Sequence, residues 1–215
     1  MISILNRLIL SSKPVPQYIC NKLYVKNLHS TSDKPHTMAT NIVWMDLEMT
    51  GLNVFTDKIL EVSCLITDQD LNIVAEGPCF AINQPKEVLE TMNEWCMKHH
   101  NESGLVDKCL KSQITTEQGE QLILDFLKKQ VPKGKCPLAG NSVYMDRLFL
   151  RKEMPQVDDY MHYRIIDVSS IKELARRWKP SVIKNAPAKI LAHRSLDDIK
   201  DSIAELKYYR KEFFS

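Results

Sequence analysis

Residues 42–52 read IVWMDLEMTGL, an apolar run that carries two acids, Asp46 and Glu48. A run of this kind is typical of a buried strand. Side chains at positions i and i+2 of a strand point to the same face, so the two carboxylates lie together near the strand's end. The next Lys or Arg along the chain is Lys58, which favours a bound Mg²⁺ or Mn²⁺ as the compensating charge. Two solvated acids at the end of a strand are the alternative.

The pattern outward from this stretch predicts an α/β domain. Strands are expected at residues 41–47, 58–67 and 71–82, which form a meander, and at residues 136–140 and 163–166. Helices are expected at residues 86–101 in one or two pieces, 103–111, 115–130 with Thr115 or Thr116 as N-cap, 142–153, 167–178 and from Ser195 onward. A meander followed by strands that alternate with helices predicts a mixed five-stranded sheet flanked by helices.

The first 37 residues differ in composition from the rest. They hold five Lys and Arg residues, one acid and several serines, which is typical of a mitochondrial transit peptide. A disordered tail is the alternative. We therefore expect a transit segment at residues 1–37, a folded domain at residues 38–215 and a mitochondrial location. Met38 is also placed to act as an internal start, which would give a cytoplasmic or nuclear form.

Charge and hydropathy limit the classes of partner. The whole chain has 29 basic and 27 acidic residues, and five basic residues and one acid precede Met38, so the net charge of +2 becomes −2 for residues 38–215. A broad basic surface for long nucleic acid is therefore not expected, and a nucleic-acid ligand should be short. No apolar run approaches the roughly 18 residues that span a bilayer, so no membrane partner is predicted. The six scattered cysteines lack zinc-ligand spacing and are interpreted as reduced thiols.

Two further clusters carry acids. Residues 139–150, AGNSVYMDRLFL, predict a short strand, a glycine turn and a helix with Asp146 near its start. Residues 192–199, AHRSLDDI, place His193 just before the last helix and Asp198 within it. Each has a structural alternative: Asp146 complements a helix dipole, Ser195 and Asp198 form a capping box, and His193 is a surface histidine.

In their order along the chain, the three clusters resemble the three motifs of the DEDDh 3′–5′ exonucleases, whose fold is ribonuclease H-like. Within that family, DLEMTGL, GNSVYMDRLFL, HYRIIDVSSIKELARRW and AHRSLDDIKDSIAEL look most like the oligoribonucleases. The resemblance implies 3′-to-5′ hydrolysis of oligoribonucleotides of about 2–5 nucleotides to 5′-mononucleotides. How far short oligodeoxyribonucleotides are also accepted stays open.

The resemblance also assigns the chemistry. Asp46, Glu48, Asp146 and Asp198 would hold two divalent ions, Mg²⁺ or Mn²⁺, which stabilise charge on the attacking and leaving oxygens. His193 would be the general base, since an ordinary histidine pKa near 6.5 leaves the imidazole neutral at physiological pH.

Substrate contacts are assigned in the same way. Leu52 resembles the family's apolar wedge between the last two bases, and Trp95 and Tyr144 are candidates for base stacking. Tyr163 corresponds to a tyrosine that oligoribonucleases contribute across a homodimer interface to the partner's active site, and Arg164 is a candidate phosphate contact.

Some of these residues have plainer interpretations. Trp95 could be a core residue of an amphipathic helix, and Arg164 could form a surface ion pair. His162 and the pair His99 and His100 match no motif and are predicted to be surface histidines.

Three rival functions are tested by the same features. A related exonuclease that trims structured RNA or proofreads DNA should show more basic surface or an appended domain. A non-catalytic RNA-binding module should have lost a motif acid. An unrelated metal-binding or structural α/β protein would carry the three ordered motifs by coincidence.

Overall fold

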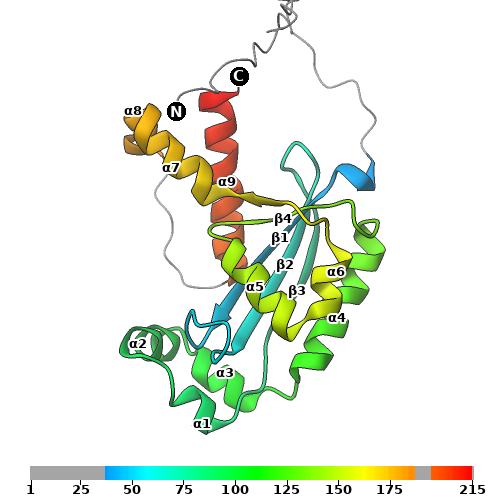
Figure 1. Ribbon diagram of the computed structural model, residues 1–215, viewed down its shortest axis with the longest axis vertical. Coiled ribbons are helices and arrows are strands. Elements are labelled where there is room, and N and C mark those ends of the chain that lie inside the picture. The colour runs from blue at the N-terminus through cyan, green and yellow to red at the C-terminus, as the bar shows by residue number, and fades with distance from the viewer. Residues whose placement is uncertain (1–36, 187–194, 215) are drawn as a thin grey trace, which may run out of the picture. The chain divides into compact units, whose positions relative to one another are not determined.

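Five strands form one mixed sheet in the order β3-β2-β1-β4-β5 (Figure 1). The strands β1 (Ile42–Met49), β2 (Ile59–Thr67) and β3 (Ile73–Ala81) are antiparallel neighbours, whereas β4 (Leu138–Gly140) and β5 (Ile165–Asp167) run parallel to β1. The computed structural model describes residues 37–186 and 195–214, all of which fall in the unit Pro35–Ser215. The predicted meander and mixed five-stranded sheet are confirmed.

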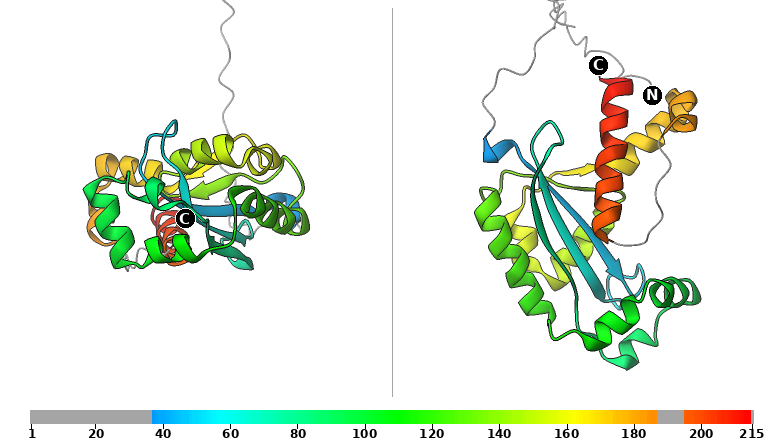
Figure 2. Two further views of the ribbon diagram at one scale, coloured as in Figure 1. Left: turned by 90° about the horizontal axis from the view of Figure 1, so that it is seen from below. Right: turned by 180° about the vertical axis from the view of Figure 1, so that it is seen from behind.

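The alternation of β1 divides the core into two layers. Val43, Met45 and Leu47 face α4 (Thr116–Gln130), α5 (Tyr144–Glu153) and α6 (Pro155–Tyr160). Trp44 faces the opposite way and packs in a cluster with residues of α7 (Val168–Trp178), α8 (Pro180–Lys184) and α9 (Ser195–Phe213). Figure 2 shows α9 on one side of the sheet and α4 on the other. Asp46 and Glu48 follow Trp44 by two and four residues, so their side chains lie on the same face of the sheet as Trp44, which is the α9 side.

Three short helices pack around Leu60 in a third apolar cluster. They are α1 (Lys86–Leu89), α2 (Glu94–Glu102) and α3 (Leu105–Lys111), so the segment predicted at residues 86–101 is two helices. The next helix, α4, begins at a capping box in which Thr115 Oγ1 accepts from the N–H of Gln118, as the Thr115 prediction required. A single 3₁₀ turn, Met38–Thr40, precedes β1.

Two helices were not expected from the sequence. Both α6 and α8 begin at a proline, Pro155 and Pro180, a residue that fits the first turn of a helix but breaks a helical pattern elsewhere. The helix predicted from residue 142 begins instead at Tyr144, because Ser142 has a left-handed φ of 53°. Gly140 is needed for close approach, since a Cβ there would lie 3.0 Å from the Met45 carbonyl oxygen.

Membrane and thiol predictions can be compared with the described part of the chain. Among its helices, none combines the length and the apolar character needed to cross a membrane. Its five cysteines, Cys64, Cys79, Cys96, Cys109 and Cys136, are all free thiols.

Candidate active site

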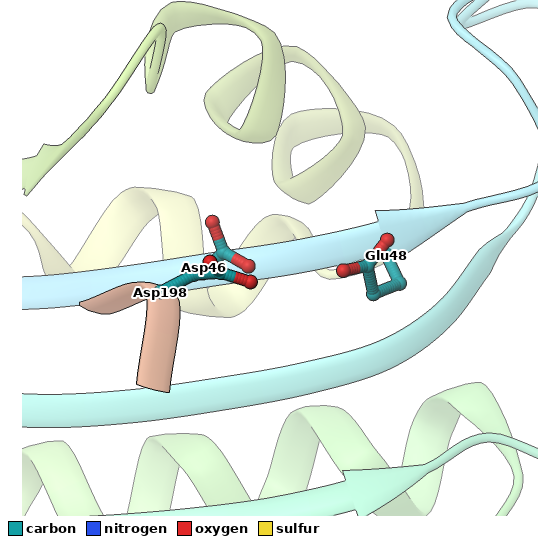
Figure 3. A group of neighbouring side chains, drawn as sticks. All are labelled: Asp46, Glu48 and Asp198. Atoms are coloured by element: carbon teal, nitrogen blue, oxygen red, sulfur yellow. The ribbon is translucent and has the colours of Figure 1, made fainter. Parts of the chain in front are cut away.

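Three carboxylates meet where β1 passes the beginning of α9. Asp46 and Glu48 rise from the same face of β1, and Asp198 comes from the first turn of α9 (Figure 3). One oxygen from each carboxylate can be chosen so that all three lie within 4.8 Å of one another. The i, i+2 prediction for the acid pair is confirmed, and the third motif supplies a residue to the same point in space.

The fourth predicted acid approaches from the other layer. Asp146 is buried in the first turn of α5, and its Oδ1 accepts a hydrogen bond of 2.9 Å from the backbone N–H of Leu47. Asp146 is not part of the three-carboxylate group, but it lies close enough that its charge raises the pKa of Asp46. A role limited to helix-dipole complementation does not account for this long-range contact.

Electrostatics in the group are unfavourable without a cation. Burial, followed by the charges of neighbouring acids, raises the pKa of Asp46 well above its usual range and that of Glu48 to about 7. Burial is also the largest cause that raises the pKa of Asp146 to about 7. Asp46 and Glu48 are both partly buried, which the alternative of two freely solvated acids does not explain. Carboxylates gathered in this way fit a hard divalent cation.

A mainly apolar cavity of about 400 Å³ opens beside Glu48. Leu52 and Trp95 border it and are 69% and 61% exposed, so the alternative that Trp95 is a core residue is wrong. The cavity is lined by Leu47, Glu48, Met49, Gly51, Leu52, Asn93, Trp95, Cys96 and His100. Exposed apolar side chains next to a carboxylate group suit a flat ring held by stacking.

His100 is the residue that the sequence placed wrongly. Predicted at the surface, it is 4% exposed, and its Nε2 lies 3.0 Å from the Met49 carbonyl oxygen. Its Nδ1 lies 4.0 Å from Glu48 Oε2. His100 follows Cys96 by four residues, and both are buried on the inner face of α2, a helical spacing that could have revealed it. His99 is half-buried with its ring against that of Trp95.

A family model described as "Exonuclease" matches residues 43–206, which include Asp46, Glu48, Asp146 and Asp198. The chain is an oligoribonuclease-type member of the exonuclease family. The resemblance seen in the three acid clusters is thereby confirmed, and so is the prediction of an exonuclease enzyme.

Relatives of this exonuclease align over most of its length. A protein of Drosophila melanogaster named probable oligoribonuclease is 62% identical over 175 residues, which cover 81% of this chain and 83% of that protein. Proteins of human and mouse named oligoribonuclease, mitochondrial, are 54% and 53% identical over 178 residues, covering 83% of this chain and 75% of each relative.

Solved structures support the fold of the exonuclease. Exonuclease I from Methylocaldum szegediense has a TM-score of 0.62 and 14% identity and covers 81% of this chain. E. coli exonuclease I, solved in complex with a dA16 oligonucleotide, has a TM-score of 0.62 and 15% identity. This chain spans about two fifths (41%) of each of those chains, so the likeness concerns the fold alone. The predicted ribonuclease H-like fold is confirmed.

Three predicted substrate contacts of the exonuclease lie outside the cavity lining. Tyr163 is 71% exposed, and the guanidinium of Arg164 lies 5.0 Å from the centre of its ring, a contact different from the surface ion pair that was the alternative for Arg164. Tyr144, the first residue of α5, is 53% exposed. His193, predicted to be the general base, falls outside the described residues.

Arg147 is a contact that the sequence did not single out. Its Nη1 donates to the carbonyl oxygens of His162 and Tyr163 at 2.8 and 2.9 Å, and its Nε donates to Asp158 at 2.8 Å. Because Arg147 directly follows Asp146, the helix that presents a motif acid also holds the backbone of the exposed tyrosine.

Ser195 makes a hydrogen bond that the capping-box alternative did not predict. It is the first residue of α9, is fully buried, and donates its hydroxyl proton to Glu61 Oε2 at 2.7 Å. This contact gives Ser195 a tertiary role beside the capping-box alternative, and Glu61 enters the site as a residue that no motif had marked.

Proposed function

We propose that this exonuclease removes 5′-mononucleotides one at a time from the 3′ end of short single-stranded oligoribonucleotides. The observation that carries the proposal is the group formed by Asp46, Glu48 and Asp198 next to the cavity bordered by Leu52 and Trp95. Carboxylates that can hold a divalent ion, set beside an apolar site for a base, suit hydrolysis of a terminal phosphodiester.

The four acids would hold two ions, Mg²⁺ or Mn²⁺, since hard divalent cations prefer carboxylate oxygens. When bound, the ions would stabilise negative charge on the attacking and leaving oxygens. Asp46, Glu48 and Asp198 already approach within 4.8 Å, and Asp146 is fixed to the β1 backbone between the first two. The raised pKa values of Asp46, Glu48 and Asp146 support the need for positive charge at this position.

The chain's other residues would position the substrate and move its proton. Leu52 would separate the last two bases, and Trp95 would stack on one of them. His193 would accept the proton of the attacking water, because a neutral imidazole is a base at physiological pH. Tyr144 remains a candidate for a further stacking contact.

Short substrates are favoured by the charge of the folded part of the chain. The net charge of −2 over residues 38–215 leaves little attraction for a long phosphate backbone. A related enzyme that trims longer RNA or DNA is the second candidate, and the solved relatives include exonuclease I bound to oligodeoxyribonucleotides.

Two further proposals concern location and assembly. The acid-poor residues 1–37 would direct the chain to mitochondria, in line with the names of the human and mouse relatives. Tyr163 would act in the active site of a second copy within a homodimer, with Arg164 near a substrate phosphate. The exposure of Tyr163 and its fixed backbone support that arrangement.

The function is tested with 5′-labelled oligoribonucleotides of two to five nucleotides and with a labelled RNA 30-mer. Each substrate is incubated with the enzyme in Mg²⁺ or in EDTA. The variant Asp198→Ala removes one acid of the group, and Asp197→Ala is its matched control because Asp197 is the adjacent exposed acid of α9. We expect mononucleotides from the short substrates with Mg²⁺, a loss of at least about 100-fold in Asp198→Ala and none in Asp197→Ala.

Uncleaved dinucleotides under every condition would refute the proposed substrate. Faster degradation of the 30-mer than of the short set would favour the trimming enzyme.

A further inference from the structure

A buried polar network joins β2 to the beginning of α9. Glu61 and Ser63 of β2 and Ser195 of α9 are 6%, 0% and 0% exposed. Ser195 donates to Glu61 Oε2 at 2.7 Å, and its oxygen lies 2.5 Å from that of Ser63. A hydroxyl has one proton, and a carboxylate only accepts, so Ser63 is the donor to Ser195. The three side chains form one directed chain of hydrogen bonds that ends on the carboxylate of Glu61.

The network lies directly beside the acid pair. In the antiparallel pairing of β1 and β2, Glu61 is opposite Glu48 and Ser63 is opposite Asp46. Residues that are directly opposite share a face of the sheet, with Cβ atoms about 4.5–5.5 Å apart. Ser195 therefore reaches the same face of the sheet that carries Asp46 and Glu48.

The position of Ser195 on α9 connects the network to the third acid. Ser195 precedes Asp198 by three residues, which places the two side chains on neighbouring parts of the helix surface, one turn apart. A rotation of α9 about its axis would move both side chains together. A hydrogen bond depends more steeply on direction than an apolar contact does, so the contact of Ser195 with Glu61 limits rotation of α9 and with it the direction of Asp198.

A second contact holds α9 on the other side of Asp198. Asn141 Nδ2 donates to Ser202 Oγ at 2.8 Å, and Ser202 Oγ donates to the Asp198 carbonyl oxygen at 2.8 Å. Asp198 thus lies between one anchor on β2 and another at the turn after β4. Replacing Ser195 removes the hydrogen bonds that join the first residue of α9 to Glu61 and Ser63 of β2.

The negative charge of Glu61 is partly balanced from outside. Lys108 Nζ lies 3.4 Å from Glu61 Oε1, and the lysine side chain is half exposed to solvent. Burying a carboxylate costs free energy even with such partners, and an apolar pair at Glu61 and Ser195 would anchor α9 with less cost. A directional role explains why acid and hydroxyl occupy these positions.

We propose that Glu61 is a positioning residue for Asp198, acting through Ser195 to hold the first turn of α9 so that Asp198 faces Asp46 and Glu48. The proposal rests on the proposed function only in taking the three acids as the place where the divalent ion binds. It predicts that Glu61 and Ser195 affect metal binding without touching metal or substrate.

The test compares Glu61→Ala, Glu61→Gln and Ser195→Ala with the matched control Glu120→Ala in the full chain. Glu120 is 7% exposed and accepts from the N–H and the Nε2 of Gln156 at 2.7 and 2.9 Å, on α4 and away from the acid group. Mn²⁺ affinity is measured by calorimetry on metal-free protein, thermal unfolding is recorded in EDTA, and kcat and KM are measured on a labelled dinucleotide.

Replacing a residue that orients a metal ligand typically weakens binding about 10–100-fold, so we expect a loss of Mn²⁺ affinity of about tenfold or more in Glu61→Ala and Ser195→Ala. We expect kcat to fall with them while KM stays within about twofold, since substrate contacts are intact. Glu61→Gln keeps an acceptor oxygen for Ser195 and should restore Mn²⁺ affinity to within about threefold. The control Glu120→Ala should lose stability and keep wild-type Mn²⁺ affinity.

The proposal would be overturned if Ser195→Ala and Glu61→Ala bound Mn²⁺ with wild-type affinity and lost stability to the same extent as Glu120→Ala. Glu61 and Ser195 would then have a purely structural role. If Glu61→Ala does not fold, Ser195→Ala decides by itself. Should wild-type protein bind Mn²⁺ but leave every oligoribonucleotide intact, the proposed function fails, while the effect of Ser195→Ala on Mn²⁺ affinity still tests the positioning of Asp198.

Discussion

The backbone N–H of Leu47 donates a hydrogen bond of 2.9 Å to Oδ1 of Asp146, 99 residues further along the chain. Leu47 lies between Asp46 and Glu48, so this contact ties the acid of α5 to the strand that carries the acid pair. The bond also compensates part of the cost of burying Asp146, since its carboxylate accepts the N–H of β1.

Asp146→Asn should separate the charge of this residue from its hydrogen bond. The amide oxygen can still accept from Leu47, so in EDTA we expect stability equal to or above wild type, because one buried negative charge is gone. Activity on a dinucleotide should fall at least about 100-fold. Asp146→Ala loses the bond as well and should cost about 1–3 kcal/mol in the free energy of unfolding, measured by urea denaturation. Equal stability of the two variants would contradict the role of the bond.

The stability of the metal-free protein should fall as pH rises. The pKa of Glu48 and that of Asp146 are both raised to about 7 in the folded protein, above their ordinary values near 4, so the folded state binds more protons between these values. The stabilisation is present at low pH and is lost as pH rises through about 7, by about 1–3 kcal/mol per group. Urea denaturation in EDTA from pH 5.5 to pH 8 measures it.

A matched variant and added metal test the cause of this pH dependence. Glu48→Gln combined with Asp146→Asn should flatten the profile, and Mg²⁺ should raise wild-type stability most at pH 8, where the carboxylates are ionised. A wild-type stability in EDTA that increases toward pH 8 would be inconsistent with the raised pKa values.

The exposed side chains at the cavity should contribute to substrate binding and leave folding unaffected. Base stacking on an aromatic side chain is worth about 1–3 kcal/mol, so Trp95→Ala should raise KM for a dinucleotide about 5–150-fold. Leu52→Ala should act in the same direction. Leu122→Ala, an apolar residue of α4 that is 44% exposed, is the control and should leave KM unchanged. Steady-state kinetics with equal melting temperatures would establish the difference, and an unchanged KM in Trp95→Ala would argue against stacking.

Complementation tests whether Tyr163 acts in a second copy. Tyr163→Ala and Asp198→Ala should each be inactive as homodimers, yet a heterodimer would contain one intact site made of acids from one copy and tyrosine from the other. An equimolar mixture that exchanges subunits freely should regain about one quarter of wild-type activity, because half of its dimers have one of two sites restored. No recovery in a mixture shown to exchange subunits would place Tyr163 in its own copy's site or outside the chemistry.

Arg147→Lys, which weakens the hydrogen bonding to the Tyr163 backbone, should lower activity without unfolding the chain.

Local patterns were sufficient for much of the fold and part of the site. A strand period of two placed Asp46 and Glu48 on one face, and the sequence around Thr115 predicted the cap of α4. Short helices that begin at Pro155 and Pro180 were missed, because a proline signals a break unless the fold supplies packing for the turn that follows.

The sequence by itself determined which residues of this protein carry the acids and on which elements they lie, because the periods of strands and helices are local properties of the backbone. Only the tertiary structure decided which faces meet. His99 and His100 are adjacent in sequence, yet the packing of α2 against the end of β1 buries the second beside Glu48. The sequence around Ser195 is also compatible with a helix cap, but because α9 packs against β2, the Ser195 hydroxyl donates a hydrogen bond to Glu61. Such contacts join residues more than 50 positions apart, and no local pattern encodes the distance between them.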